Sequence, residues 1–136
     1  MRMRSQVKFP VLGVDLGEKN IGLAWASNEW VMETLEVEKR IGVKMGFKVI
    51  NNYIKELKIK TIIIGEPEKG KIRFWAKELV KFLKSEHKNL KIKVVPETLS
   101  SKKAWQIMSR LGLSFKEKKD KDHGFAALEI LKEAIG

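Results

Sequence analysis

The segment from Val11 to Ser27, VLGVDLGEKNIGLAWAS, places a carboxylate inside an otherwise apolar run. Asp15 stands in the first apolar half, a glycine-containing turn follows it, and a second apolar half begins at Ile21. Burying an ionised carboxylate in a strand core costs on the order of several kcal/mol unless a metal ion or a fixed donor compensates it. The segment therefore predicts two strands joined by a tight turn, with Asp15 belonging to a site. The alternative, a structural Asp15 bonded to backbone amides at Gly17, is disfavoured by such apolar flanks.

Length and composition exclude several classes of protein. The 136 residues are enough for one core and too few for two, so residues 1–136 are predicted to form a single domain. The absence of cysteine excludes disulfides, thiolate metal sites and cysteine nucleophiles. No run approaches the ~18 apolar residues of a membrane span, and no apolar segment follows the basic N-terminus. A cytoplasmic protein is expected.

Positive charge is the strongest global signal. The chain has 28 Lys and Arg against 17 Asp and Glu, which gives a net charge of +11. Such an excess favours polyanions because their binding releases counterions, so nucleic acid is the expected partner. A lysine-rich solubilising surface is the other interpretation, since charge alone specifies neither a ligand nor a reaction.

Hydrophobic periodicity indicates an alternation of strands and helices. Strands are expected at residues 8–16, 21–27, 30–37, 60–64 and 91–95, and helices at 39–57, at 71–86 with Trp75 facing inward, from Ser100 or Ser101 to 111, and from 122 onward. A meander followed by βαβ units predicts an α/β fold with a five-stranded mixed sheet. Numbered along the chain, the strands have the order 3-2-1-4-5, with helices on both faces. The strand that carries Asp15 is then central.

Two more acidic residues are expected at the carboxyl edge of that sheet. Glu97 follows the predicted strand 91–95, and Asp122 begins the last predicted helix. Open α/β sheets bind ligands at this edge, so both acids can converge with Asp15. Carboxylate oxygens suit Mg²⁺ or Mn²⁺, and two such ions roughly 4 Å apart can activate a water for phosphodiester hydrolysis. Considered one at a time, a solvated Glu97 and a helix-capping Asp122 are the simpler interpretations.

Four blocks of the chain carry a family resemblance. In order they read VLGVDLGEKNIGLAWAS, IIIGEPEKG, VVPETLSSKKA and KDHGFAALEIL, and together they resemble the blocks of the YqgF/RuvX family. The resemblance implies a ribonuclease H-like fold and the activity of a Holliday junction resolvase or of a nuclease that matures the 5′ end of pre-16S rRNA. It maps the family's acids to Asp15, Glu97 and Asp122, and its substrate-facing turns to residues 17–22 and 65–67.

The chain departs from the family's pattern around these acids. Asn20 stands where an arginine is usual, Pro96-Glu97-Thr98 replaces Asp-Glu-Arg, and Glu66 occupies a position that is commonly apolar. The metal-binding acids are kept while the polar groups around them differ. Activity is therefore expected, whereas the family's substrate preference does not transfer.

Polar and basic residues near the predicted edge are the expected contacts to nucleic-acid phosphates. They lie in the turn after Asp15, around the predicted helix starts and in the basic loop before the last helix: Gly17, Lys19, Asn20, Lys69, Lys71, Lys102, Lys103, Lys116, Lys118, Lys119 and Lys121. Asp120 and His123 are further candidates for the metal site, although a solvated acid and an exposed histidine are the simpler interpretations. Trp30, beside a turn, is a candidate for stacking on an unpaired base.

The leading hypothesis is a Mg²⁺- or Mn²⁺-dependent endonuclease that acts on structured DNA or RNA. Asp15 would bridge two ions, and Glu97 and Asp122 would each complete one. A nucleic-acid-binding module with vestigial acids would instead bind in a salt-sensitive way without cleavage. An ATP-binding domain of the actin and sugar-kinase type also has an Asp-x-Gly phosphate loop. The choice between DNA junction and precursor rRNA, and between monomer and homodimer, stays open.

Overall fold

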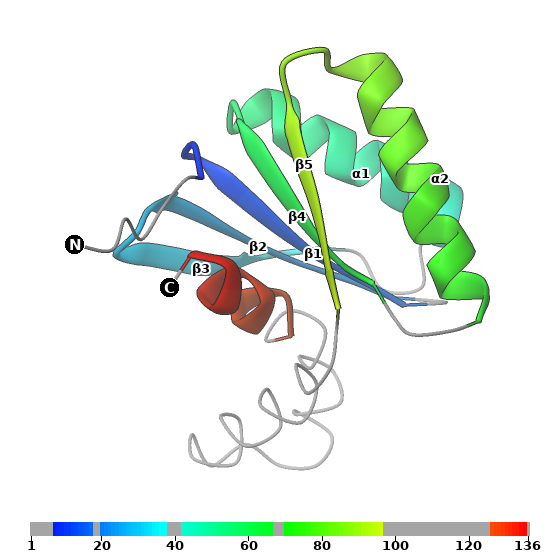
Figure 1. Ribbon diagram of the computed structural model, residues 1–136, viewed down its shortest axis with the longest axis horizontal. Coiled ribbons are helices and arrows are strands. Elements are labelled where there is room, and N and C mark those ends of the chain that lie inside the picture. The colour runs from blue at the N-terminus through cyan, green and yellow to red at the C-terminus, as the bar shows by residue number, and fades with distance from the viewer. Residues whose placement is uncertain (1–6, 18–19, 38–41, 67–69, 97–125, 136) are drawn as a thin grey trace.

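The computed structural model describes residues 7–17, 20–37, 42–66, 70–96 and 126–135 (Figure 1). Its elements are β1 (Val11–Leu16), β2 (Ile21–Asn28), β3 (Val31–Leu35), α1 (Gly42–Glu56), β4 (Thr61–Glu66), α2 (Lys71–Glu86) and β5 (Lys91–Pro96), followed by a helix over residues 126–135. The predicted strands and first two helices end within about three residues of these bounds. The predicted helix from Ser100 or Ser101 to 111 lies outside the described residues, as does the predicted start of the last helix at 122.

The strands form one five-stranded sheet of order β3-β2-β1-β4-β5, as the sequence predicted. β1 is central because it pairs antiparallel with β2 on one side and parallel with β4 on the other. The unbroken apolar run of β4 is buried from Thr61 to Gly65, as expected of a strand that is covered on both faces. The carboxyl ends of β1, β4 and β5 therefore lie at the same edge of the sheet.

Alternate residues of the central strands face two different apolar cores. Leu12, Val14 and Ile62 pack with α1 and α2 on one face of the sheet. Val11 and Ile63 pack with residues 126–135 on the other face. Figure 1 shows the same arrangement, with α1 and α2 together on one side of the sheet and the C-terminal helix on the opposite side. The predicted helices on both faces are confirmed.

The two long helices pack on each other as well as on the sheet. The rings of Phe47 in α1 and Phe82 in α2 stack with their centroids 5.8 Å apart. Trp75, which the sequence placed on the inner face of α2, is only half-buried, and the small Ala76 beside it is fully buried instead. Within the described ranges no helix is long and apolar enough to cross a membrane.

The C-terminal helix lies directly on the backbone of β1 at Gly13. A Cβ atom built on Gly13 would lie 2.6 Å from Cγ of Leu131 and 2.9 Å from the carbonyl oxygen of Ala127. Both separations are shorter than real Cβ contacts, so only glycine fits under the helix in this position. In Figure 1 the helix runs opposite to β1, and its orange start lies toward the carboxyl half of the strand.

Candidate functional site

Asp15 lies on the face of β1 that carries the C-terminal helix, two residues beyond Gly13. Side chains alternate along a strand, so Val11, Gly13 and Asp15 share one face, and contacts of the first two place that face toward residues 126–135. The Asp15 side chain is 1% exposed, which makes it the most deeply buried charged side chain among the described residues. The prediction that this carboxylate lies inside the fold is confirmed.

Both strand neighbours of Asp15 are glycines. Asp15 pairs with Gly22 of β2 on one side and with Gly65 of β4 on the other. Paired residues point to the same face of a sheet, with Cβ atoms typically about 5 Å apart. Because neither neighbour has a side chain, the sheet on both sides of the carboxylate is bare backbone. The sequence marked both glycines as parts of turns, but only the strand register shows that they flank Asp15 in one row.

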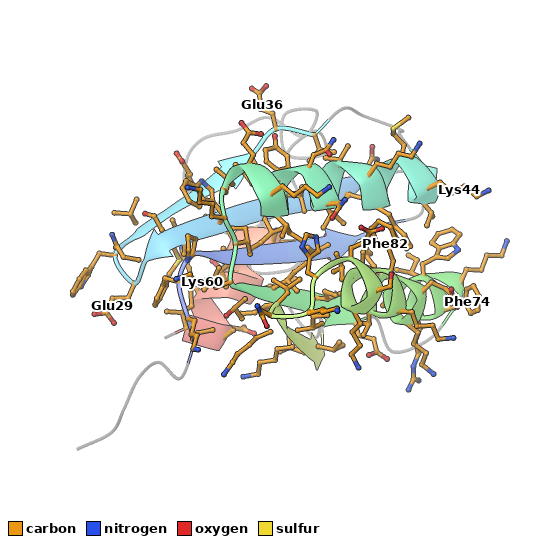
Figure 2. All side chains as sticks on the ribbon, turned by 90° about the horizontal axis from the view of Figure 1, so that it is seen from above. Glu29, Glu36, Lys44, Lys60, Phe74 and Phe82 are labelled. Atoms are coloured by element: carbon orange, nitrogen blue, oxygen red, sulfur yellow. The ribbon has the colours of Figure 1, made fainter. Side chains whose placement is uncertain are left out.

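Other residues of the predicted interface lie at the same edge as Asp15. Gly17 follows β1, Asn20 precedes β2, and Lys71 begins α2 after the carboxyl end of β4. Figure 2 shows Lys44 and Phe74, which lie near the starts of α1 and α2, at one end of the molecule. The remaining predicted contacts lie outside the described residues: Lys19, Lys69, Lys102, Lys103, Lys116, Lys118, Lys119 and Lys121.

Glu66 lies at the same edge but on the other face of the sheet. It continues the alternation of Ile62 and Ile64, which pack with α1 and α2, whereas Gly65 continues the row of Asp15. The Nε atom of Arg73, in the first turn of α2, donates to Oε1 of Glu66 at 2.8 Å. This ion pair joins the end of β4 to the start of α2 and keeps Glu66 apart from the Asp15 face.

The acids predicted to join Asp15 lie beyond the described part of the chain. Glu97 follows the last described residue of β5, and Asp122 precedes the first described residue of the C-terminal helix. Asp120 and His123 fall in the same span. Among the residues that the structure describes, no three acidic or histidine side chains gather closely enough to share a metal ion.

The chain matches a family of nucleases over nearly its whole length. A family model described as RuvX, Holliday junction resolvase, matches residues 10–136. A protein of Syntrophomonas wolfei that is assigned by name as a pre-16S rRNA nuclease is 31% identical over 126 residues, which cover 89% of each chain. A protein of a Sulfurihydrogenibium species with the same name is 32% identical over 127 residues, covering 89% of this chain and 86% of the relative.

Solved structures of junction resolvases share the fold. RuvC of T. thermophilus, in complex with a Holliday junction substrate, superposes with a TM-score of 0.62 at 17% identity, covering 92% of both chains. The resolvase of Fowlpox virus, in complex with Holliday junction DNA, superposes with a TM-score of 0.59 at 15% identity, covering 93% of this chain and 97% of the viral one. The resemblance read from the four sequence blocks is thereby confirmed. The chain belongs to the RuvX family of Holliday junction resolvases, and it is a nuclease with a ribonuclease H-like fold.

Proposed function

We propose that this nuclease hydrolyses phosphodiester bonds in structured nucleic acid at a divalent-cation site formed by Asp15, Glu97 and Asp122. The observation that carries the proposal is the setting of Asp15, which is buried on the central strand between two glycines. A charged side chain that is buried in this way needs a compensating partner. A divalent cation can be that partner, and it also supplies the chemistry by which many nucleases hydrolyse phosphodiester bonds.

Strand geometry supports Glu97 as the second ligand. Val95 of β5 pairs with Gly65 of β4, so it belongs to the same row as Asp15. Glu97 is two residues further along the chain, and side-chain direction repeats every two residues in a strand. We therefore expect Glu97 on the face of Asp15, one row closer to the carboxyl edge.

Helix geometry supports Asp122 as the third ligand. The described part of the C-terminal helix starts at residue 126 on the side of the carboxyl half of β1 (Figure 1). Asp122 precedes that residue by four positions, about one helical turn. An acid there is expected near the carboxyl edge, beside Asp15. Asp120 and His123 are within two residues of Asp122 in the sequence and are proposed as supporting groups.

The chemistry of these donors fits Mg²⁺ or Mn²⁺. Three carboxylates offer only oxygen ligands, which hard divalent cations prefer, and no cysteine is present to favour softer metals. Bound cations, two in our proposal, supply a water activated for attack and neutralise charge on the scissile phosphate. Asp15 fixes the position of the site because it belongs to the central strand.

The other residues of the edge position the substrate. The bare backbone at Gly22 and Gly65 leaves the flanks of the carboxylate clear, so a phosphate can approach without meeting a side chain of the sheet. We propose that Lys71, at the start of α2, contacts the phosphates of the substrate through its charge, and that Asn20, before β2, contacts them through hydrogen bonds. In this arrangement no side chain acts as a nucleophile.

We propose precursor rRNA as the substrate. Relatives that are about 30% identical over most of the chain are named as pre-16S rRNA nucleases, whereas the junction-bound structures are at most 17% identical and support the fold alone. Cutting one strand requires one active site, so a monomer suffices for this role. Symmetric resolution of a four-way junction would require two copies of the chain.

A two-substrate cleavage assay tests the proposal. The full chain is incubated with a pre-16S rRNA fragment spanning the mature 5′ end and with a four-way DNA junction, each in Mg²⁺, in Mn²⁺ and in EDTA. We expect cleavage of the RNA that requires the cation and disappears in Asp15→Asn. Preferential cleavage of the junction by a chain that sediments as a dimer would assign it to recombination. Binding of both substrates without cleavage in any cation would refute the proposed site.

A further inference from the structure

The end of the sheet opposite Asp15 carries exposed lysines from three separate segments. Lys8 precedes β1, Lys60 precedes β4, and Lys91 begins β5. All three side chains are exposed. In Figure 2, Lys60 lies toward the side on which Glu29 is labelled, whereas Lys44 and Phe74 lie at the opposite end, so this amino edge is distinct from the edge at which Asp15 is found.

Backbone hydrogen bonds hold these three segments together. The amide of Lys60 donates to the carbonyl oxygen of Pro10 at 2.9 Å, and the amide of Lys91 donates to the carbonyl oxygen of Lys60 at 3.0 Å. The hydroxyl of Thr61 donates to the carbonyl oxygen of Lys8 at 2.9 Å. The lysines are thus carried by adjacent, fixed backbone, with neighbouring strands about 4.8 Å apart.

The edge strand β5 extends this positive charge toward the row of Asp15. Lys91 pairs with Thr61 and Lys93 pairs with Ile63, so both lysines point to the face that Asp15 shares with Ile63. Residues two apart along a strand lie about 6.6 Å apart. Along β5 the rows therefore read Lys91, Lys93 and then Val95, the last in the row of Asp15. We call Lys8, Lys60, Lys91 and Lys93 the lysine track.

The lysines of the track form no ion pair with an acid of the described residues. The segments that hold it, residues 7–10, 57–60 and 88–95, contain no Asp or Glu. Glu56 and Glu86 end α1 and α2, Glu97 follows β5 outside the described residues, and none of the ion pairs among the described residues includes a lysine of the track. Like charges held together repel, and this cost is relieved when a polyanion binds. A merely solubilising surface gains nothing from such segregation.

We propose that the lysine track is a second nucleic-acid-binding surface, which holds the sugar-phosphate backbone of the substrate away from the cleaved bond. The inference rests on the proposed function for the identity of the ligand. Val11 lies four positions before Asp15, which corresponds to about 13 Å along the strand, and the amino edge lies just beyond Val11. A nucleic-acid duplex carries one negative charge per ~1.7 Å of its axis. A duplex segment that reaches from the active site to the lysine track therefore presents many phosphates to the lysines.

Two charge-matched variants test the proposal. The first replaces the track by Lys8→Gln, Lys60→Gln, Lys91→Gln and Lys93→Gln. The second makes the control substitutions Lys55→Gln, Lys77→Gln, Lys81→Gln and Lys84→Gln, all at exposed positions of α1 and α2. Each lowers the net charge from +11 to +7, since four lysines are replaced. The probe is the pre-16S rRNA fragment in EDTA, titrated by fluorescence anisotropy at several salt concentrations.

We expect the track variant to bind on the order of 10²-fold more weakly near 0.15 M salt, with a salt slope reduced by about three to four. The control variant is expected to stay within about threefold of the parent, with a slope change below about one. Equal losses in both variants would mean that only net charge matters, and parent-like binding by the track variant would equally overturn the proposal. Thermal melting checks that both variants are folded.

Cleavage in Mg²⁺ separates this inference from the proposed function. On a short RNA that covers only the cleaved site, the track variant is expected to cut at the parent's rate, and on the long fragment its KM rises while kcat is kept. If the parent cuts nothing and the track variant still binds RNA more weakly, the proposed function is refuted, whereas the binding role of the lysine track is supported. If the parent cuts and the track variant has the parent's KM on the long fragment, only the binding role of the lysine track is refuted.

Discussion

The two edges of the sheet handle charge in opposite ways. At the carboxyl edge Asp15 is buried between two glycines. At the amino edge the lysines of the track are exposed, and only the backbone beneath them is fixed. Catalysis needs a desolvated donor at a defined position, whereas holding a polyanion needs only density of charge, which hydrated lysines provide. In our proposal one sheet supplies both functions and keeps them at different edges.

Asp15→Asn is expected to have the largest effect, because it should separate cleavage at the carboxyl edge from RNA binding. It removes the charge of Asp15 at nearly constant volume, so cleavage should fall by on the order of 10³-fold or more. Binding of the RNA in EDTA should be unchanged or slightly tighter, because repulsion from the phosphates is lost. Single-turnover cleavage and anisotropy measure the two effects, and cleavage within tenfold of the parent would contradict the assignment of Asp15.

Gly65→Ala tests whether the bare backbone beside Asp15 matters. Gly65 is not among the described glycines with positive φ, so alanine suits its backbone, but the new methyl group would stand in the row of Asp15. We expect cleavage to fall by roughly 10- to 100-fold, as for other changes next to a metal ligand, with little loss of stability. Ile63→Val, one row away, is the matched control and should cost about 1 kcal/mol of stability with cleavage retained. Similar rates for both variants would show that the space beside Asp15 is not used.

Gly13→Ala tests the support beneath the carboxyl edge. The added methyl would overlap Leu131 and the carbonyl oxygen of Ala127, so the helix must shift. Overpacking of this kind costs about 1–3 kcal/mol, which urea denaturation measures. Combining the change with Leu131→Ala should destabilise less than the sum of the two single variants, because one of the overlaps is removed. Strict additivity would mean that the helix does not rest on Gly13 in solution.

Glu66→Gln tests whether any acid at the carboxyl edge is sufficient for catalysis. Glu66 faces away from Asp15 and pairs with the half-exposed Arg73, so we expect a stability loss of about 1 kcal/mol or less. Cleavage should change by less than about threefold. A loss comparable to that of Asp15→Asn would place Glu66 among the metal ligands.

Tyr53 belongs to neither edge and gives the smallest expected effect. Burial, followed by the charges of Glu56 and Glu36, raises the pKa of Tyr53 above its usual 10, and its hydroxyl donates to the carbonyl oxygen of Glu36 at 2.7 Å. The folded state therefore favours the neutral phenol. This contribution is present below pH 10 and is lost as the pH rises through the folded pKa. Denaturation between about pH 8 and 11 should show a steeper alkaline decline for the parent than for Tyr53→Phe.

The fold could be read from the sequence because its signals are local. The apolar run around Asp15, the change to helical spacing after the third strand and the short β-branched run of β4 each identify one element, and chain connectivity then limits their order. The size of the side chains that pack against the sheet was harder to predict from the sequence. Periodicity alone placed Trp75 inside, whereas the close packing of α2 on the sheet favours the small Ala76.

Strand register is what the sequence could not supply. The alignment of Gly22 and Gly65 with Asp15, and of Lys91 beside Lys60, arises from hydrogen bonds between segments that are far apart in the chain. No local pattern contains that information. The track was missed for this reason, since each of its lysines looks like an ordinary surface residue. Glu97 and Asp122 stay predictions, because they lie outside the described residues.

The seat of the C-terminal helix on Gly13 has a mechanical consequence. Because Gly13 has no side chain, the Leu131 side chain and the carbonyl oxygen of Ala127 lie directly on the backbone of β1, and no rotamer change at Gly13 can absorb a small displacement of the helix. A displacement of this helix toward the sheet is therefore expected to be passed on to β1 and, two residues further along the strand, to Asp15.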